Sequence, residues 1–166
     1  GTFNRFSNCT ATNVTGHSFE INTDMDTLAD CYVEQCDQYG IFLNDADTCW
    51  VSNCRVTYCD QIGFYLNDAD VGWVSGCFAG RCGTYGYRLN AADSCFLYNV
   101  VGETCGAGIS LTASDSNTFD SCSSQGAVKT SGGYGFALDN GSDYNVFTNC
   151  ATIRDSFEPG TRWSTS

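Results

Sequence analysis

The sequence predicts an all-β fold, a right-handed parallel β-helix (solenoid) of about six coils with a repeat of about 23 residues. Two observations carry this prediction. The first is an internal repeat, because Cys31, Cys54 and Cys77 are spaced 23 residues apart and other residue types recur at that interval. The second is composition, because each repeat holds three short runs of β-branched and aromatic residues separated by Gly, Asn and Asp, which is typical of strands joined by tight turns.

Several further columns of like residues follow the same interval. They are Gly40, Gly63, Gly86, Gly108 and Gly135; Leu43, Leu66, Leu89, Leu111 and Leu138; and Trp50, Trp73, Phe96, Phe119 and Phe147. A leucine-rich repeat has a similar length, but it needs several constant leucines in each unit and this unit has one. No segment sustains the apolar period of 3.6 that marks a helix. We therefore expect like residues of successive coils to lie above one another, about 4.8 Å apart.

The first strand of each coil is expected over a run such as GIFL at residues 40–43. Side chains alternate between the two faces of a strand, so Ile41 and Leu43 are expected to point inward and Phe42 outward. The NDAD sequence that follows has the composition of a turn. The constant leucine is thus expected to line the interior of every coil.

The second strand, around TCWVS at residues 48–52, is expected to bury Trp50 and to turn the next residue outward. The expected outward row is Val51, Val74 and Leu97. A bend then leads to a third strand, in which Cys54 and Val56 are expected to be buried and Arg55 exposed. The bend positions hold Asn8, Asn53, Gly76, Asn99 and Asn149, residue types that tolerate the left-handed backbone region.

Most of the twelve cysteines fall in two columns. One column is Cys9, Cys31, Cys54, Cys77, Cys122 and Cys150, and the other is Cys36, Cys59, Cys82 and Cys105. Because a thiol packs as a small apolar group and Val100 replaces it in one coil, this cysteine ladder favours a buried packing role. The alternatives are a bridge between stacked coils, or across a corner as in Cys31 to Cys36, and a metal site. Parallel side chains disfavour the bridge, and the cost of ionised thiols in an apolar core disfavours the metal.

Aspartates form another column after the first strand, namely Asp47, Asp70, Asp93, Asp115 and Asp143. The favoured interpretation is an Asx-turn, in which each side chain bonds the backbone of its own corner. The alternative is Ca²⁺, because a hard divalent ion relieves the repulsion of stacked carboxylates, with Asp45 and Asp68 as additional ligands. We expect no cofactor and no metal site, with calcium at this corner as the less favoured interpretation.

Composition excludes some classes of partner. Seven basic residues against nineteen acidic ones give a net charge of −12, which argues against nucleic acid. No run of about 18 apolar residues is present, so we expect no membrane span.

The repeat G-[IFY]-x-L-N-x-A-D-x-x-W-V-S-N-C resembles the parallel β-helix repeats of the pectin-lyase-like superfamily, which includes NosD-like proteins, polysaccharide lyases, alginate epimerases and viral tailspikes. The resemblance covers about Phe6 to Thr152. It is specific for the fold and weak for function, because the shared residues are those that build coils.

In the lyases that the chain resembles, the outward face of the first strand carries substrate. Here that face holds Glu20, Phe42, Tyr65, Arg88 and Ser110, one from each coil. Phe42 and Tyr65 are candidates for a platform under sugar rings, and Arg88 for binding a carboxylate or hydroxyl. We therefore predict carbohydrate binding at Glu20, Phe42, Tyr65 and Arg88. A contact with a partner subunit is the competing interpretation of the exposed aromatic residues.

Two functions are compatible with this pattern. The favoured one is a non-catalytic β-helix module of a virion, as in tailspikes, or of a cell-surface protein, which forms a rigid rod and contacts a glycan or a partner. The alternative is a polysaccharide-processing enzyme of the lyase, hydrolase or epimerase type. The D-P-H-E type motif of the epimerases is absent, and the single histidine, His17, reads as a surface turn residue.

The remaining expectations concern organisation and setting. Residues 1–153 are expected to form the β-helix, and 154–166 a cap or a linker to a further domain. Exposed apolar rows predict self-association, as a trimer, or burial within a larger chain from which this sequence is a fragment. Acid-rich composition and sequons at Asn8, Asn13 and Asn140 favour an extracellular or virion-surface location.

Overall fold

The computed structural model describes residues 3–126, 134–139 and 141–153, and these form strands and turns throughout. The predicted cap or linker at 154–166 and the sequon at Asn140 lie outside the described residues. Within the described ranges, no helix has the length and apolar character needed to cross a bilayer.

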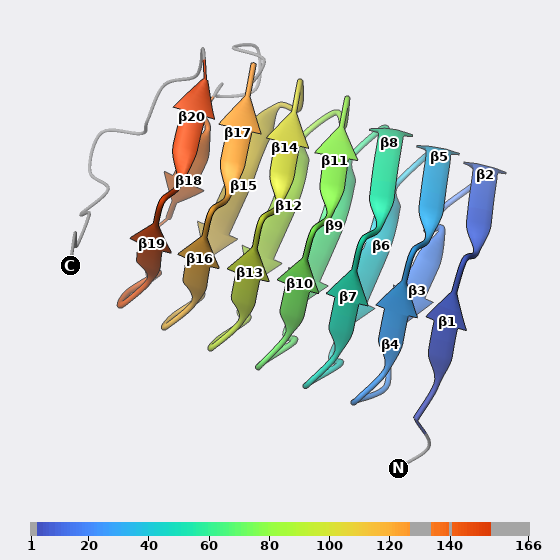
Figure 1. Cartoon of the computed structure of the whole chain (residues 1–166), viewed down its shortest axis with the longest axis horizontal. Helices are drawn as coiled ribbons and strands as arrows, with labels where there is room; N and C mark the ends of the chain where they lie inside the picture. Colours follow the sequence, from blue (N-terminus) through green and yellow to red (C-terminus); the bar gives the residue numbers. More distant parts are fainter. Residues whose placement is uncertain (1–2, 127–133, 140, 154–166) are drawn as a thin grey trace.

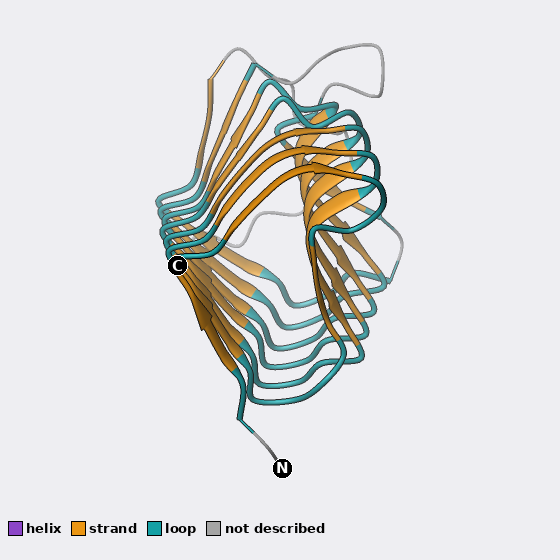
Figure 2. Ribbon diagram, turned by 90° about the vertical axis from the view of Figure 1, so that its right-hand side faces the viewer, coloured by secondary structure: helices purple, strands orange, loops and turns teal. Residues whose placement is uncertain are grey.

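Three parallel sheets form the walls of a solenoid (Figures 1 and 2). Sheet A holds β1 (Arg5–Ser7), β4 (Thr27–Ala29), β7 (Trp50–Ser52), β10 (Trp73–Ser75), β13 (Phe96–Tyr98), β16 (Thr118–Asp120) and β19 (Val146–Thr148). Sheet B holds β2 (Thr10–Val14), β5 (Tyr32–Cys36), β8 (Arg55–Cys59), β11 (Phe78–Gly80), β14 (Val101–Glu103), β17 (Ser123–Gln125) and β20 (Ala151–Ile153). Sheet C holds β3 (Phe19–Ile21), β6 (Tyr39–Asn44), β9 (Ile62–Asn67), β12 (Tyr85–Asn90), β15 (Ala107–Thr112) and β18 (Phe136–Leu138). Each strand pairs with the strands three places before and after it in the chain, as a solenoid of about six coils requires.

The stacking register confirms the predicted interior of the first strand. Leu43, Leu66 and Leu89 are paired in succession between β6, β9 and β12, and all are buried. The glycine that precedes them is required by close approach: a Cβ at Gly63 would lie 2.7 Å from the carbonyl oxygen of Gly86 on the next coil. Larger residues at that column would therefore separate the coils.

The predicted phase of the second strand is wrong. Trp50 and Trp73 point outward and are 41% and 46% exposed, whereas Val51, Val74 and Leu97 are buried in the core. The pairing also places Phe119 beside Leu97, and Thr118 beside Phe96. The aromatic column predicted from the sequence thus crosses from the outer to the inner row, because Gly86 and Gly108 are separated by 22 residues and one residue is missing from that coil.

The bend between sheets A and B is confirmed in its backbone conformation. Asn8, Asn53, Asn99 and Asn149 have φ between 51° and 55°, and Gly76 has φ 60°. In the strand that follows, Cys54 and Val56 are buried and Arg55 is exposed, as predicted. The single left-handed residue turns the chain sharply enough for the two short strands to lie on different walls.

The buried cysteines act as hydrogen-bonding connectors between coils as well as packing groups. Cys77 Sγ accepts a bond from the backbone amide of Cys54 (3.4 Å) and donates to the carbonyl of Ser75 (3.3 Å). Asn117 performs the same task in the column of Cys95, where its Oδ1 accepts from the Cys95 amide (2.7 Å) and its Nδ2 donates to Ala92 (3.0 Å). A thiol at these corners therefore supplies polar partners for backbone groups that the bends leave unpaired.

One inter-coil bridge is also present, between Cys36 on β5 and Cys59 on β8, whose Cα atoms are 4.6 Å apart. The other ten cysteines are free, and eight of them are buried. Both the packing role and a bridge between stacked coils thus occur in the cysteine ladder.

Candidate functional site

The outer face of sheet C brings the predicted site residues into one row. Strand pairing places Glu20 beside Phe42, Phe42 beside Tyr65, Tyr65 beside Arg88 and Arg88 beside Ser110. Because the strands are in register, this row runs along the axis of the solenoid. Tyr65 and Arg88 are half-buried, Glu20 is exposed and Ser110 is buried.

An aromatic cluster surrounds the first half of this row. The rings of Phe42 and Tyr65 stack at a centroid distance of 5.1 Å. Tyr39 meets both rings edge-on, and its own face is stacked on His17 at 4.5 Å. Phe42 is only 9% exposed, so the more accessible rings of the cluster belong to its neighbours.

Arg88, on β12, lies at the end of the cluster. Its guanidinium carbon lies 5.7 Å from the ring centre of Tyr65 and 5.2 Å from that of Tyr85, within range of cation–π attraction. Among the described residues, Arg88 Nε is one of four buried side-chain nitrogen or oxygen atoms without a hydrogen-bond partner. His17 Nδ1, in the aromatic cluster, is another.

The phenol of Tyr65 is held neutral beside this arginine. Burial raises the pKa of Tyr65, although the positive charge of Arg88 acts in the opposite direction. The neutral hydroxyl donates to Asn67 Oδ1 at 3.0 Å. Asn67 is in turn bonded to Asn44 and Asn90 of the adjacent coils, each at 2.9 Å. This short asparagine chain fixes the orientation of the Tyr65 ring.

We refer to His17, Tyr39, Phe42, Tyr65, Tyr85 and Arg88 as the outer aromatic cluster. Sequence reasoning found three of the six and missed His17, Tyr39 and Tyr85. Tyr39 and Tyr85 are both paired with Ile62 at the start of their strands, so they belong to a column that precedes the constant glycine. Because tyrosine recurs at this position of the sequence, the column could have identified Tyr39 and Tyr85 as neighbours of the site. Glu20 lies at the end of the row, where its Oε1 accepts from Asn22 Nδ2 at 3.3 Å.

The aspartate column is a hydrogen-bonded ladder between coils, which corrects the predicted Asx-turn. Oδ1 of each aspartate from Asp24 to Asp115 accepts from the backbone amide of the aspartate on the next coil, at distances of 2.6–2.9 Å. The aspartate ladder comprises Asp24, Asp47, Asp70, Asp93, Asp115 and Asp143. These carboxylates thus bind backbone, and the ladder holds successive corners together.

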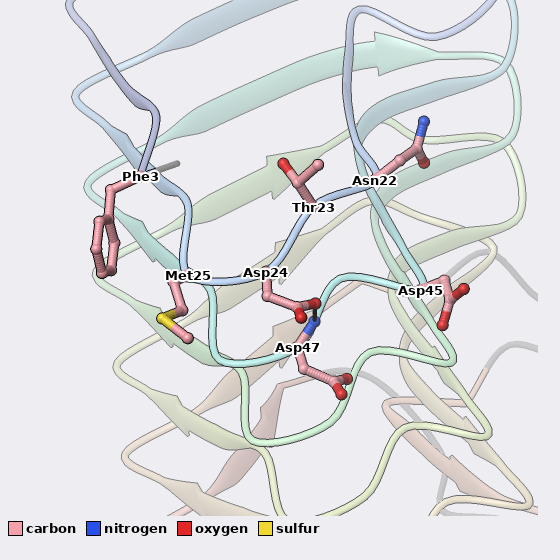
Figure 3. Close-up of a pocket in the computed structure, with 7 residues that line it drawn as sticks. All are labelled: Phe3, Asn22, Thr23, Asp24, Met25, Asp45 and Asp47. Atoms are coloured by element: carbon pink, nitrogen blue, oxygen red, sulfur yellow. Dashed lines mark hydrogen bonds between the residues drawn. The ribbon is translucent and has the colours of Figure 1, made fainter. Parts of the chain in front are cut away.

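A shallow pocket lies at the first steps of the ladder (Figure 3). Its polar lining includes Asp24, Asp45 and Asp47, and its apolar lining includes Phe3 and Met25. The bond from the Asp47 amide to Asp24 crosses this pocket. In the described part of the chain, no group of three or more His, Cys, Asp or Glu side chains is arranged to hold a metal ion. Calcium at this corner remains a prediction from sequence.

Comparison with known proteins identifies relatives of the fold. The model of the family described as "Right handed beta helix region" matches residues 1–152. No curated protein sequence matches the chain.

Two solved structures share its architecture. One is the enzymatically active domain of tailspike protein 2 of bacteriophage CBA120, with a TM-score of 0.72 and 16% identity over 87% of this chain. The other is the A-module of the mannuronan C-5 epimerase AlgE4 of Azotobacter vinelandii, with a TM-score of 0.65 and 10% identity over 87% of this chain. The match spans 24% of the tailspike domain and 53% of the epimerase module, and at these identities the likeness establishes the fold.

Proposed function

Because the chain belongs to the right-handed β-helix family, we propose that it is a non-catalytic β-helix module whose outer aromatic cluster binds a glycan. The observation that carries the proposal is the position of Arg88, beside two tyrosine rings and with its Nε buried and unpartnered. Rings offer apolar faces to the C–H groups of a sugar, and a guanidinium offers donors to its oxygen atoms.

Within this proposal each residue has a distinct task. The half-buried ring of Tyr65 contacts a sugar, and Phe42 of the adjacent coil stacks on that ring and holds its orientation. Arg88 donates to a carboxylate or hydroxyl, and a carboxylate is the stronger acceptor. Glu20, exposed at the far end of the row, accepts from a sugar hydroxyl.

The structural role of the aspartate ladder favours binding over catalysis. Five carboxylates of the aspartate ladder accept backbone amides, so their roles are structural. The regular stacking also gives the rigid rod that a tailspike-like or cell-surface module requires. The fold neighbour from a bacteriophage tailspike and the Cys36–Cys59 bridge support an extracellular or virion setting.

A polysaccharide-processing enzyme is the second candidate, because the two fold neighbours are an enzymatically active tailspike domain and an epimerase module. In that case Glu20, as the carboxylate of the row, is the candidate acid or base. Glu20→Gln would then abolish turnover. In the binding role, the same substitution weakens affinity only moderately.

Isothermal titration calorimetry with mannuronate oligosaccharides tests the proposal. Arg88→Ala and Tyr65→Ala are expected to weaken binding about tenfold or more, because each removes a central contact. Arg55→Ala is the matched control, since Arg55 lies 4.1 Å over the ring of Phe78 on the outer face of sheet B. Its affinity is expected to equal that of the wild type.

The same mixtures, analysed by mass spectrometry and NMR, separate the two candidate functions. Unchanged oligosaccharides with saturable binding support the binding module. Shortened, unsaturated or epimerised products would show an enzyme. Equal loss of binding in Arg55→Ala and Arg88→Ala would contradict a specific glycan site on sheet C.

Self-association is a further part of the proposal, because exposed aromatic residues are unusual on a soluble monomer. The expected assembly is a trimer, or a contact with other parts of a longer chain. Light scattering during size-exclusion chromatography measures the mass directly. A monomer at all concentrations would contradict the trimer.

A further inference from the structure

The outer face of sheet A carries a second aromatic row, which we call the tryptophan strip: Trp50, Trp73 and Phe96 on β7, β10 and β13 (Figure 1). The three residues are paired in register, so that one ring follows another along the axis. The rings of Trp73 and Phe96 are 5.1 Å apart. This strip was expected in the core, and neither the outer aromatic cluster nor the aspartate ladder includes it.

A row of hydroxyl groups runs beside the strip. Two residues further along each strand lie Ser52, Ser75 and Tyr98, which are paired in register with one another and point to the same face. Tyr98 is 46% exposed. The outer face of sheet A therefore presents an apolar row of rings and, beside it, a row of groups that can form hydrogen bonds.

The face is also free of charge over its central part. From β4 to the start of β16 its outward positions are Thr27, Ala29, Trp50, Ser52, Trp73, Ser75, Phe96, Tyr98 and Thr118. Within the described strands of sheet A, outward charged residues occur only towards the ends, at Arg5 and Asp120. The aspartate ladder lies three residues before the rings, so the flanking charge is negative. A strip without charged side chains of its own, flanked by carboxylates, disfavours an anionic ligand and offers an uncharged one rings and hydroxyls.

We infer that the tryptophan strip is a second binding site, for an uncharged polysaccharide chain that lies along the solenoid axis. The ring faces of Trp50 and Trp73 contact the C–H faces of successive sugars, and the serine and tyrosine hydroxyls bond sugar hydroxyls. A second copy of this chain is the less suitable occupant. In a dry protein interface each hydroxyl of the row would need a partner, whereas a sugar chain carries hydroxyl groups along its whole length.

This site is independent of the outer aromatic cluster, because the two lie on different sheets and differ in charge. The cluster on sheet C contains the cation Arg88, whereas the charges that flank the strip are carboxylates of the aspartate ladder, three residues before each ring. Their ligands and their variants are therefore separable in one set of measurements.

The test is calorimetric titration of the intact chain with three neutral probes, namely cellohexaose, laminarihexaose and mannohexaose. We expect saturable binding of at least one probe, weakened about tenfold or more in Trp50→Ala and in Trp73→Ala. Both positions are exposed, so these variants are expected to fold, and circular dichroism verifies this. Tyr58→Ala, on β8 of sheet B and 44% exposed, is the matched control and is expected to bind as the wild type does.

Arg88→Ala keeps the neutral-probe affinity if the strip is the site, even where it abolishes mannuronate binding. The inference is overturned if none of the three probes binds, or if binding survives Trp50→Ala and Trp73→Ala. It is also overturned if the wild type is a dimer or trimer that Trp73→Ala converts to a monomer, since the occupant would then be a second copy.

Discussion

The substitution Tyr87→Phe is expected to stabilise the protein. Tyr87 is fully buried, its ring stacks on Phe64 at 4.8 Å, and its hydroxyl is one of the four unpartnered buried atoms among the described residues. Burial raises the pKa of Tyr87 well above its ordinary value, so the phenol is neutral in the folded state. It therefore brings an unsatisfied donor into the core.

The size of the effect follows from two opposing contributions. Removing an unsatisfied buried hydroxyl recovers about 1–3 kcal/mol. The space left by one oxygen atom, on the order of 10 Å³, costs about 0.3 kcal/mol. Phenylalanine already occupies the same column at Phe64 and Phe136, so the ring itself fits. The expected net gain is about 1–2 kcal/mol in the free energy of unfolding.

Urea unfolding followed by circular dichroism measures this gain as a higher midpoint with an unchanged slope. Tyr65→Phe is the matched control on the outer face, where loss of the bond to Asn67 is expected to cost about 0.5–1.5 kcal/mol. A Tyr87→Phe variant that is less stable than the wild type would refute the reasoning, because the phenol would then have a partner in the core.

Two further predictions concern the corners of the coils. Asp70→Ala is expected to lose about 1.5–3 kcal/mol, because the Asp93 amide loses a charged acceptor at 2.7 Å, whereas Asp70→Asn keeps an acceptor oxygen and loses less; equal midpoints for the two variants would contradict this. Asp26 gives a pH dependence: burial raises its pKa, but bonds from Thr23 and Asn4 outweigh burial and lower it overall. Its contribution is therefore present above about pH 4, the unfolded value, and lost as pH falls towards the lower folded value. Urea midpoints between pH 5 and 2 should fall less in Asp26→Asn than in the wild type.

The solenoid could be predicted because each column repeats in the printed sequence. In the first strand, glycine and leucine each recur at a fixed position, and asparagine recurs at the bend. Strand alternation therefore identified the inner face of the first strand. The outer row from Glu20 to Ser110 followed from the same alternation. These assignments depend only on counting residues within a coil.

The second strand could not be assigned in this way. In β7 both Trp50 and Val51 are apolar, so alternation alone does not decide which side chain points inward. Size is a poor guide too, because the inner row holds valine, leucine and, at Phe119, an aromatic ring. The 22-residue coil then aligned Phe119 with the wrong row.

The hydrogen-bonding roles of the corner residues were also inaccessible from sequence. Whether an aspartate bonds its own turn or the next coil depends on the direction of backbone amides, which the residue types do not encode. The thiol of Cys77 presents the same difficulty, because packing and weak hydrogen bonding require the same small side chain.

Chemical-shift mapping of the isotope-labelled protein during titration with mannuronate oligosaccharides tests the central claim most directly. If the outer aromatic cluster is the glycan site, the amides of β6, β9 and β12 and the side-chain signal of Arg88 shift and saturate together. Shifts confined to sheet B, or to the aspartate ladder, would contradict the claim.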